Sequence, residues 1–177
     1  MMFAVTKRLL LRPGWSNDAP AMARAIADEQ IVRNLARAPW PYGLKDAQKH
    51  LATMASAKLP VMLITKRDNA EIVGILGFDR MKSGEIELGY WIARKHWNQG
   101  YATEACLAAL DIAKTLGFNQ IVAGHFTDNP ASGRVLRKLG FVATGEKAIR
   151  HSCGRGEEAE VLMYALDLAE GAGRVAA

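Results

Sequence analysis

Residues 94–105, RKHWNQGYATEA, combine basic residues, a glycine and the start of a helix, and this combination suits an anion such as phosphate. Apolar residues recur every three or four positions after Gly100, which predicts a helix over about residues 100–116. A helix N-terminus carries unpaired N–H groups and about half a positive charge, so acidic residues are favoured there. Here three basic residues come first, and the first acid is Glu104. A bound phosphate group would explain this order; an ordinary basic turn is the alternative.

Hydrophobic periodicity and turn residues predict the elements that position this loop. Helices are expected at about 16–29, 44–58, 100–116 and 128–140, with a short helical piece around 31–35. Strands are expected at 7–13, 60–65, 71–78, 84–93, 119–126, 141–150 and 159–168. Strands followed by helical crossovers and a closing hairpin indicate a mixed α/β sheet. We therefore expect one domain over residues 1–177, with its core at about 6–168 and a frayed tail at 169–177.

The composition narrows the classes of partner. The net charge of +5 favours anionic ligands, but no basic block interleaved with aromatic residues predicts nucleic-acid binding. Two cysteines make no disulfide framework, and they form no zinc-type pattern with the histidines, so no metal is expected. The sequence shows no apolar run of membrane-spanning length and no signal-peptide pattern, so we expect a cytoplasmic protein without membrane partners.

Five segments in register resemble the RimJ/RimL-type branch of the GNAT N-acetyltransferases. They are ELGYWIARKHWNQGYATEA, DNPASGRVLRKLGF, KRLLLRP, PWPYGLKDA and VLMYAL, and the resemblance covers about residues 6–168. It implies the GNAT fold, a mostly antiparallel sheet with one parallel, splayed strand pair and flanking helices. It also implies transfer of an acetyl group from acetyl-CoA to a primary amine, by direct attack in a ternary complex. The amine would belong to a protein N-terminus or to a small molecule.

The resemblance implies that backbone N–H groups of the loop hold the CoA pyrophosphate. By position, these residues are Trp97, Asn98, Gln99, Gly100, Tyr101, Ala102 and Thr103. Trp97 stands where the wider family has Gln or Arg, and an aromatic residue is common there in this branch. The pantetheine arm is implied to lie between strands ending near Ile92 and Phe126. Its amides would pair with the backbone of Trp91, Ile92 and Ala93.

The chemistry requires a base for the amine and an acid for the departing thiolate. We expect Glu87 to be the base, directly or through water, with Glu85 as the competing candidate. The alternative is that both glutamates are solvated strand residues without a catalytic role. The Tyr that most GNAT enzymes use as the acid is absent, because Leu136 occupies its position. We expect Ser132 to donate the proton instead, or else merely to support its helix turn.

Further polar and aromatic candidates have both a functional and a structural interpretation. Asn129 matches the residue that hydrogen-bonds the pantetheine arm, and it is equally a good helix cap. Trp40 and Tyr42, in a proline-rich loop, are expected to line the acceptor pocket, or alternatively to anchor the loop. His125 is expected to be a core residue rather than a functional one, and His151 is a weaker candidate still.

Two other functions remain open from the sequence. The missing Tyr favours a noncatalytic CoA-binding module as the first alternative. A basic interaction domain for nucleic acid or protein is the second. The acceptor amine and the oligomeric state, monomer or homodimer, do not follow from the residues.

Overall fold

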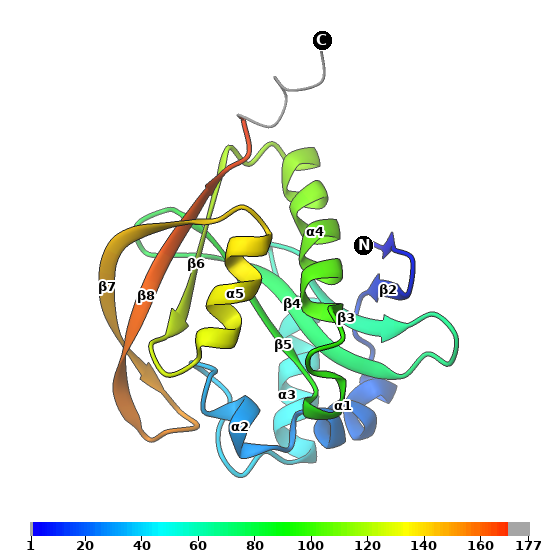
Figure 1. The fold of residues 1–177 in the computed structure, drawn as a ribbon. Helices are drawn as coiled ribbons and strands as arrows, with labels where there is room; N and C mark the ends of the chain where they lie inside the picture. The colour runs from blue at the N-terminus through cyan, green and yellow to red at the C-terminus, as the bar shows by residue number, and fades with distance from the viewer. Residues whose placement is uncertain (1, 170–177) are drawn as a thin grey trace.

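The computed structural model describes residues 2–169 and contains one eight-stranded sheet (Figure 1). The strand order is β1-β2-β3-β4-β5-β6-β8-β7. The strands are β1 (Ala4–Val5), β2 (Leu9–Arg12), β3 (Val61–Lys66), β4 (Ile72–Arg80), β5 (Ile86–Ile92), β6 (Gln120–Phe126), β7 (Val142–Ser152) and β8 (Glu157–Asp167). Neighbouring strands run antiparallel except for β5 and β6, which are parallel. This confirms the predicted mixed α/β class.

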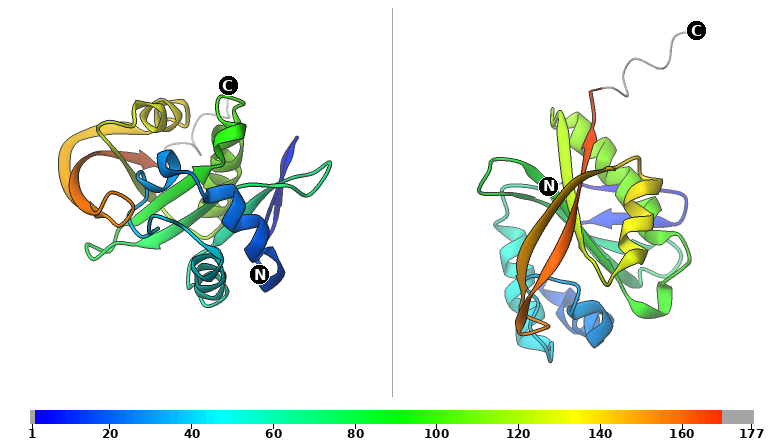
Figure 2. Two further views of the ribbon diagram at one scale, coloured as in Figure 1. Left: turned by 90° about the horizontal axis from the view of Figure 1, so that it is seen from below. Right: turned by 60° about the vertical axis from the view of Figure 1, so that its left-hand side comes forward.

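Helices cover both faces of the sheet (Figure 2). They are α1 (Ala19–Ile26), α2 (Glu29–Val32), α3 (Leu44–Ala55), α4 (Tyr101–Thr115) and α5 (Pro130–Lys138), with 3₁₀ turns η1 (Ser16–Asp18) and η2 (Arg94–His96). The frayed tail predicted at residues 169–177 lies outside the described residues, apart from Ala169.

The alternation of side chains along β5 divides the core between the two faces of the sheet. Leu88 and Ile92 belong to the core under α4 and α5. Trp91 belongs to a second core, which α1 and α3 cover. A ligand that reaches the edge of β5 can therefore be contacted from both layers of helices.

The parallel strands β5 and β6 are paired over a short stretch only. Within the described residues, β5 and β6 share one registered pair, Glu87 with Val122. Strand β5 then continues to Ile92 and β6 to Phe126, while their outer edges remain paired with β4 and β8. The two facing edges diverge toward the α4 loop, so the predicted splayed pair is confirmed.

Candidate active site

The loop before α4 presents a run of free backbone donors. Gly100, the residue before the helix, has φ of +78°, a left-handed conformation that favours glycine, and Asn98 has φ of +60°. Glu104 donates the first helical N–H, to the Gly100 carbonyl. Within residues 2–169, the N–H groups of residues 98–103 have no acceptor. Unpaired N–H groups at the start of a fifteen-residue helix make this loop suitable for a phosphate.

The basic residues that precede the loop are neutralised by acids from distant parts of the chain. Arg94 pairs with Asp28 at 3.2 Å. Lys95 pairs with Glu71, which also lies 3.2 Å from Nε2 of His96. The hydrogen bond from Lys95 holds the pKa of Glu71 below its ordinary value, against a smaller opposing effect of burial. These ion pairs brace the loop against distant parts of the chain.

Arg8 supplies the cation that does lie over the loop, and sequence reasoning missed it. Its Nε donates to Glu104 at 2.6 Å, and its guanidinium lies 4.4 Å from the centroid of the Tyr101 ring. Its Nη2 is 3.5 Å from the position that a Cβ on Gly100 would occupy. Burial works to raise the pKa of Glu104, but hydrogen bonds from Thr6 and Arg8 outweigh it and lower that pKa. The start of the chain is thus tied to the phosphate loop.

The side chains of two aromatic residues in the loop have structural roles. Trp97 donates its indole N–H to the Ile92 carbonyl at 2.7 Å, which joins the loop to the end of β5. The Tyr101 ring is buried and packs edge-on against His96. Tyr101 therefore has its backbone N–H, and not its ring, available to a ligand at the loop.

The register of β4 and β5 decides which backbone groups face the gap. The Ala93 N–H donates to the Val73 carbonyl, and the Ala93 carbonyl accepts from the N–H of His96. Hydrogen-bonded pairs alternate along an antiparallel ladder, so the backbone groups of Trp91 also point to β4. The groups of Ile92 and Tyr90 point the other way, although the Ile92 carbonyl already accepts from the Trp97 indole. This register changes the predicted set of backbone groups that could pair with pantetheine. Ile92 and Tyr90 belong to it, whereas Trp91 and Ala93 face β4 and do not.

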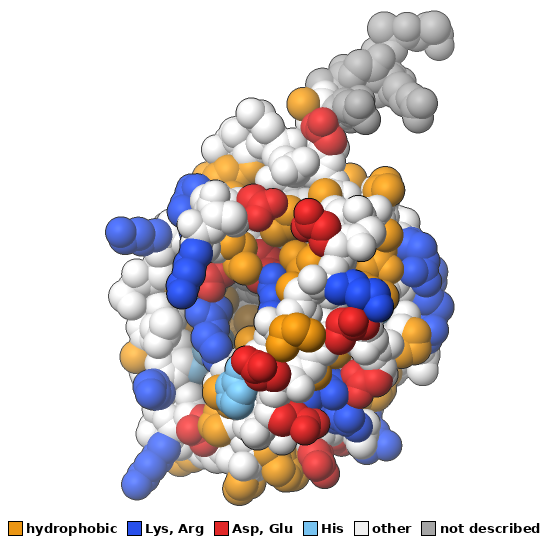
Figure 3. All heavy atoms as spheres, turned by 90° about the vertical axis from the view of Figure 1, so that its left-hand side faces the viewer, with side chains coloured by type: hydrophobic (Ala, Val, Ile, Leu, Met, Phe, Trp, Pro, Cys, Tyr) orange, Lys and Arg blue, Asp and Glu red, His pale blue; other side chains and the backbone are white. Residues whose placement is uncertain are grey.

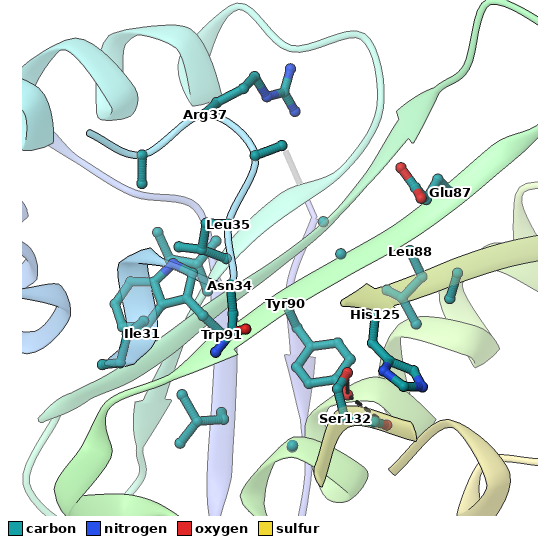
Figure 4. Close-up of a pocket in the computed structure, with 18 of the residues that line it drawn as sticks. Ile31, Asn34, Leu35, Arg37, Glu87, Leu88, Tyr90, Trp91, His125 and Ser132 are labelled. Carbon is teal, nitrogen blue, oxygen red and sulfur yellow. Dashed lines mark hydrogen bonds between the residues drawn. The ribbon is translucent and has the colours of Figure 1, made fainter. Parts of the chain in front are cut away.

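A pair of hydroxyl groups lies across the gap. The hydroxyl of Tyr90, on β5, is 2.8 Å from Oγ of Ser132, on α5 (Figure 4). Burial is the main cause that raises the pKa of Tyr90, so its phenol stays protonated at neutral pH. Leu136, at the position of the family's usual Tyr, is buried in the core. The structure thus brings a Tyr hydroxyl to Ser132 from strand β5. The resemblance implied a Tyr on the helix instead, at the position of Leu136.

Asn129 combines the two roles considered for it. Its Oδ1 accepts the Ser132 N–H at 3.4 Å, as a helix cap does. Within the described residues its side-chain nitrogen has no acceptor, so that nitrogen can still donate to a ligand.

Glu87 on β5 and Glu85, just before that strand, differ in their surroundings. Glu87 is largely buried, and its Oε1 accepts from Arg150 at 2.5 Å. Glu85 is exposed and accepts from the Ser83 hydroxyl at 2.7 Å. Glu87 lines the large cavity and Glu85 does not. Figure 4 shows the Glu87 carboxylate on the opposite side of β5 from Tyr90 and Ser132. The structure therefore favours Glu87 as the candidate base.

The proline-rich loop contributes one of its two aromatic residues to the cavity. Tyr42 is buried and lines the cavity, and burial raises its pKa to about 12, with a further contribution from Asp46. Trp40 is 41% exposed and does not line the cavity. The expectation that Trp40 contacts the acceptor is corrected by this placement.

His125 has a packing role, as the sequence suggested. Its Nδ1 lies 2.8 Å from the Phe126 carbonyl and its Nε2 lies 3.4 Å from the Tyr164 hydroxyl. The ring lies under Gly133 of α5, where a Cβ would come within 2.6 Å of Nε2. This contact sets the height of α5, and with it the position of Ser132. His151 is exposed and does not line the cavity.

We expect Gly133→Ala to lower thermal stability and to displace Ser132. A methyl group forced against a buried ring costs about 1–3 kcal/mol, or roughly 2–12 °C in Tm for a chain of this size. Differential scanning calorimetry measures the change. Because the clash is with the His125 ring, the double variant Gly133→Ala/His125→Ala should recover part of the loss. A Tm of Gly133→Ala equal to that of the parent would refute the close packing.

One continuous cavity of about 1620 Å³ links these groups. It runs from the loop at Gly100, past Tyr90 and Ser132, to Glu87 and Tyr42 beneath α3. Among the described residues, no group of three or more His, Cys, Asp or Glu side chains is arranged to hold a metal ion. No helix in the described part of the chain is long and apolar enough to cross a membrane.

Comparisons with known proteins show the family of this chain. The chain matches the family described as Acetyltransferase (GNAT) domain over residues 8–142. It is 31% identical over 153 residues to the uncharacterized N-acetyltransferase YoaA of Bacillus subtilis (strain 168), across 79% of this chain and 82% of that protein.

Two solved structures show the same fold. The GNAT-family acetyltransferase from Bacillus anthracis superposes with a TM-score of 0.81 at 25% identity, covering 94% of this chain and 98% of that one. RimL, a ribosomal L7/L12 alpha-N-protein acetyltransferase in complex with coenzyme A, superposes with a TM-score of 0.77 at 22% identity, covering the same shares.

The fold and the site together define an acetyltransferase. The chain belongs to the GNAT acetyltransferase family, as the five segments in register predicted. It also matches the ribosomal-protein-serine acetyltransferase of Escherichia coli (strain K12), at 30% identity over 88 residues and 48% of each chain, which agrees with the predicted branch.

Proposed function

We propose that this protein transfers the acetyl group of acetyl-CoA to a primary amine, on a protein N-terminus or a small molecule, with the residues described above. The observation that carries the proposal is the free-donor loop at Gly100 opening into the splayed gap beside the Tyr90–Ser132 pair. The coenzyme A bound by RimL, a structural neighbour, supports the same ligand here.

Acetyl-CoA supplies the acetyl group as a thioester, so a C–N bond forms as the C–S bond breaks. The N–H groups of residues 98–103 would bind the pyrophosphate, with Arg8 beside them. The backbone of Tyr90 and the N–H of Ile92 would pair with the pantetheine amides as an added strand does, and the side-chain nitrogen of Asn129 would donate to the arm. With the arm held in this way, the thioester would lie near Ser132, and the amine would approach from the side of Glu87.

Ser132 would give its proton to the departing sulfur. In this proposal the Tyr90 phenol is the donor of the 2.8 Å hydrogen bond to Ser132 Oγ, which would leave the serine O–H free to point into the gap. On the other side of β5, Arg150 occupies Oε1 of Glu87 and leaves Oε2 for the amine proton, directly or through water. Ser132 as the acid and Glu87 as the base, on opposite faces of β5, would suit attack of the amine on the thioester across the gap.

The remaining expectations form part of this proposal. We propose a single catalytic domain, monomeric or homodimeric, that acts in the cytoplasm without a metal or nucleic-acid partner. Both cysteines are free thiols, which is in keeping with a reducing compartment.

Thermal unfolding with acetyl-CoA, and with ATP and NAD at equal ionic strength, tests the ligand. At about 100 times its Kd, a ligand adds roughly 2.7 kcal/mol, or about 5–10 °C here. Thiol release with a panel of primary amines then tests the transfer. A rise specific to acetyl-CoA without thiol release for any amine would favour the CoA-binding module. An equal rise in Tm with every polyanion would count against both the acetyltransferase and the CoA-binding module.

A further inference from the structure

Two carboxylates lie side by side on the face of the sheet that α1 and α3 cover. Asp79 on β4 and Glu87 on β5 are register partners, and both line the cavity. Like charges directly opposite one another destabilise a sheet. Each is accordingly paired with an arginine: Arg37 lies 2.7 Å from Asp79, and Arg150 lies 2.5 Å from Glu87. The arginines come from the loop after α2 and from β7, far apart in sequence.

The sheet beside this carboxylate pair is hollow. The next register partners on the same face are two glycines, Gly77 and Gly89. A Cβ on Gly89 would meet nothing within 4 Å, whereas a Cβ on Gly77 would lie 3.0 Å from Val61, so the open position is the one above Gly89. The pair after them is Ile75 and Trp91, which is apolar. The hollow therefore has a charged end and an apolar end, with glycine as its floor.

The helix above the hollow carries a polar group without a partner. Nε2 of His50, on α3, is buried and has no hydrogen-bond partner in residues 2–169. Burial, and to a lesser extent the charge of Arg37, lowers the pKa of His50. A buried polar atom left unsatisfied is costly, and a polar ligand in this cavity would satisfy it.

Both arginines keep donors to spare. A guanidinium has five N–H donors. Arg37 uses its Nη2 for Asp79, and its side chain is 85% exposed. Arg150 uses Nη1 for Glu87, while its Nη2 lies 3.6 Å from the sulfur of Met163. Each guanidinium can therefore bind an anionic oxygen group while it holds its carboxylate.

The phosphates of coenzyme A do not explain these cations. Glu87 precedes Ile92 by five residues of extended strand, which span roughly 17 Å. The phosphate loop begins beyond Ile92, and the pantetheine arm that bridges the distance is uncharged. Even so, the cavity is lined by eight Lys and Arg residues and only three Asp and Glu residues. Figure 3 shows Lys and Arg side chains along one side of the hollow and within it.

We infer that the acceptor is an amine that carries an anionic oxygen group, a carboxylate or a phosphate, a few bonds from its nitrogen. Asp79 and Glu87 attract the ammonium form, and Glu87 removes its proton; Arg37 and Arg150 bind the anionic group. This inference rests on the proposed function. A small amino acid-like molecule and a protein N-terminus followed by an acidic residue share this chemistry.

Matched acceptors test the charge requirement. The small-molecule arm compares β-alanine with β-alaninamide, and the peptide arm compares Ala-Asp-Ala-amide with Ala-Asn-Ala-amide. We expect kcat/KM to favour the anionic member of at least one pair by about tenfold to a hundredfold, as for hydrogen bonds to charged groups. The arm with the larger preference identifies the source of the acceptor.

A pair of arginine variants tests the site itself. Arg37→Gln should reduce the anionic preference to within about threefold of unity and leave acetyl-CoA affinity unchanged. Arg24→Gln removes one exposed charge from α1, outside this cavity, and should keep the preference. An equal loss in both variants would mean a general surface field and would overturn the inference.

Failure of the inference and failure of the proposed function give different results. Amidated acceptors acetylated as well as their anionic partners would overturn the inference and leave the acetyltransferase function standing. No acetylation in either arm, with acetyl-CoA bound, would count against the function itself.

Discussion

Replacement of Gly100 by Asp is expected to weaken coenzyme A binding by about a hundredfold. Gly100 begins the run of free N–H groups before α4 and has a left-handed backbone. A carboxylate about 5 Å from a phosphate charge costs about 3 kcal/mol at an effective dielectric constant near 20, or roughly two powers of ten in Kd. The new carboxylate would also compete for Arg8, which lies beside this position. Isothermal titration calorimetry with coenzyme A gives the Kd.

Gly100→Asn is the matched control. Asn has nearly the same size as Asp and tolerates the left-handed conformation about as well, but it carries no charge. Backbone strain is thus shared by the two variants, and the difference in their Kd values isolates the charge. We expect the Asn variant to bind coenzyme A much more tightly than the Asp variant. Equal Kd values would remove the phosphate from this loop.

Ser132→Ala is expected to reduce kcat by about a hundredfold while the affinity for acetyl-CoA changes little. General acid catalysis is typically worth 10²- to 10⁴-fold, and a neutral hydroxyl is placed at the low end of that range. Loss of the hydroxyl leaves the helix cap from Asn129 intact, because that cap uses the Ser132 backbone N–H. Steady-state kinetics and equilibrium binding measured on the same preparation separate the two effects.

Tyr90→Phe tests whether the two hydroxyls act as one unit. Phe keeps the ring that packs against the core and removes the hydrogen bond to Ser132. We expect a smaller loss in kcat, about tenfold, and a double variant no slower than Ser132→Ala alone. Losses that multiply in the double variant would show independent roles. An unchanged kcat in Ser132→Ala would exclude Ser132 from the chemistry.

Short-range patterns in the sequence were sufficient to predict the order of helices and strands, the helix that begins after Gly100, and the family. Helical periodicity after Gly100 and alternation along residues 84–93 depend on neighbours a few positions away, so they can be recognised without a structure. Local signals were less reliable at the first helix. A helix is predicted from residue 16, but Ser16–Asp18 form the 3₁₀ turn η1 and α1 begins at Ala19.

Contacts between residues far apart in the chain were decided by the tertiary structure alone. The register of β4 against β5 determined that Tyr90 and Ile92, rather than Trp91 and Ala93, face the gap. The packing of α5 over the gap brought Ser132 to Tyr90, forty-two positions away. Register and packing depend on how whole elements meet, and a shift of one residue reverses every side chain of a strand. The sequence by itself therefore determined the kind of protein, and it predicts the loop that would bind phosphate. The tertiary structure decided which hydroxyl, which carboxylate and which arginines meet at the site.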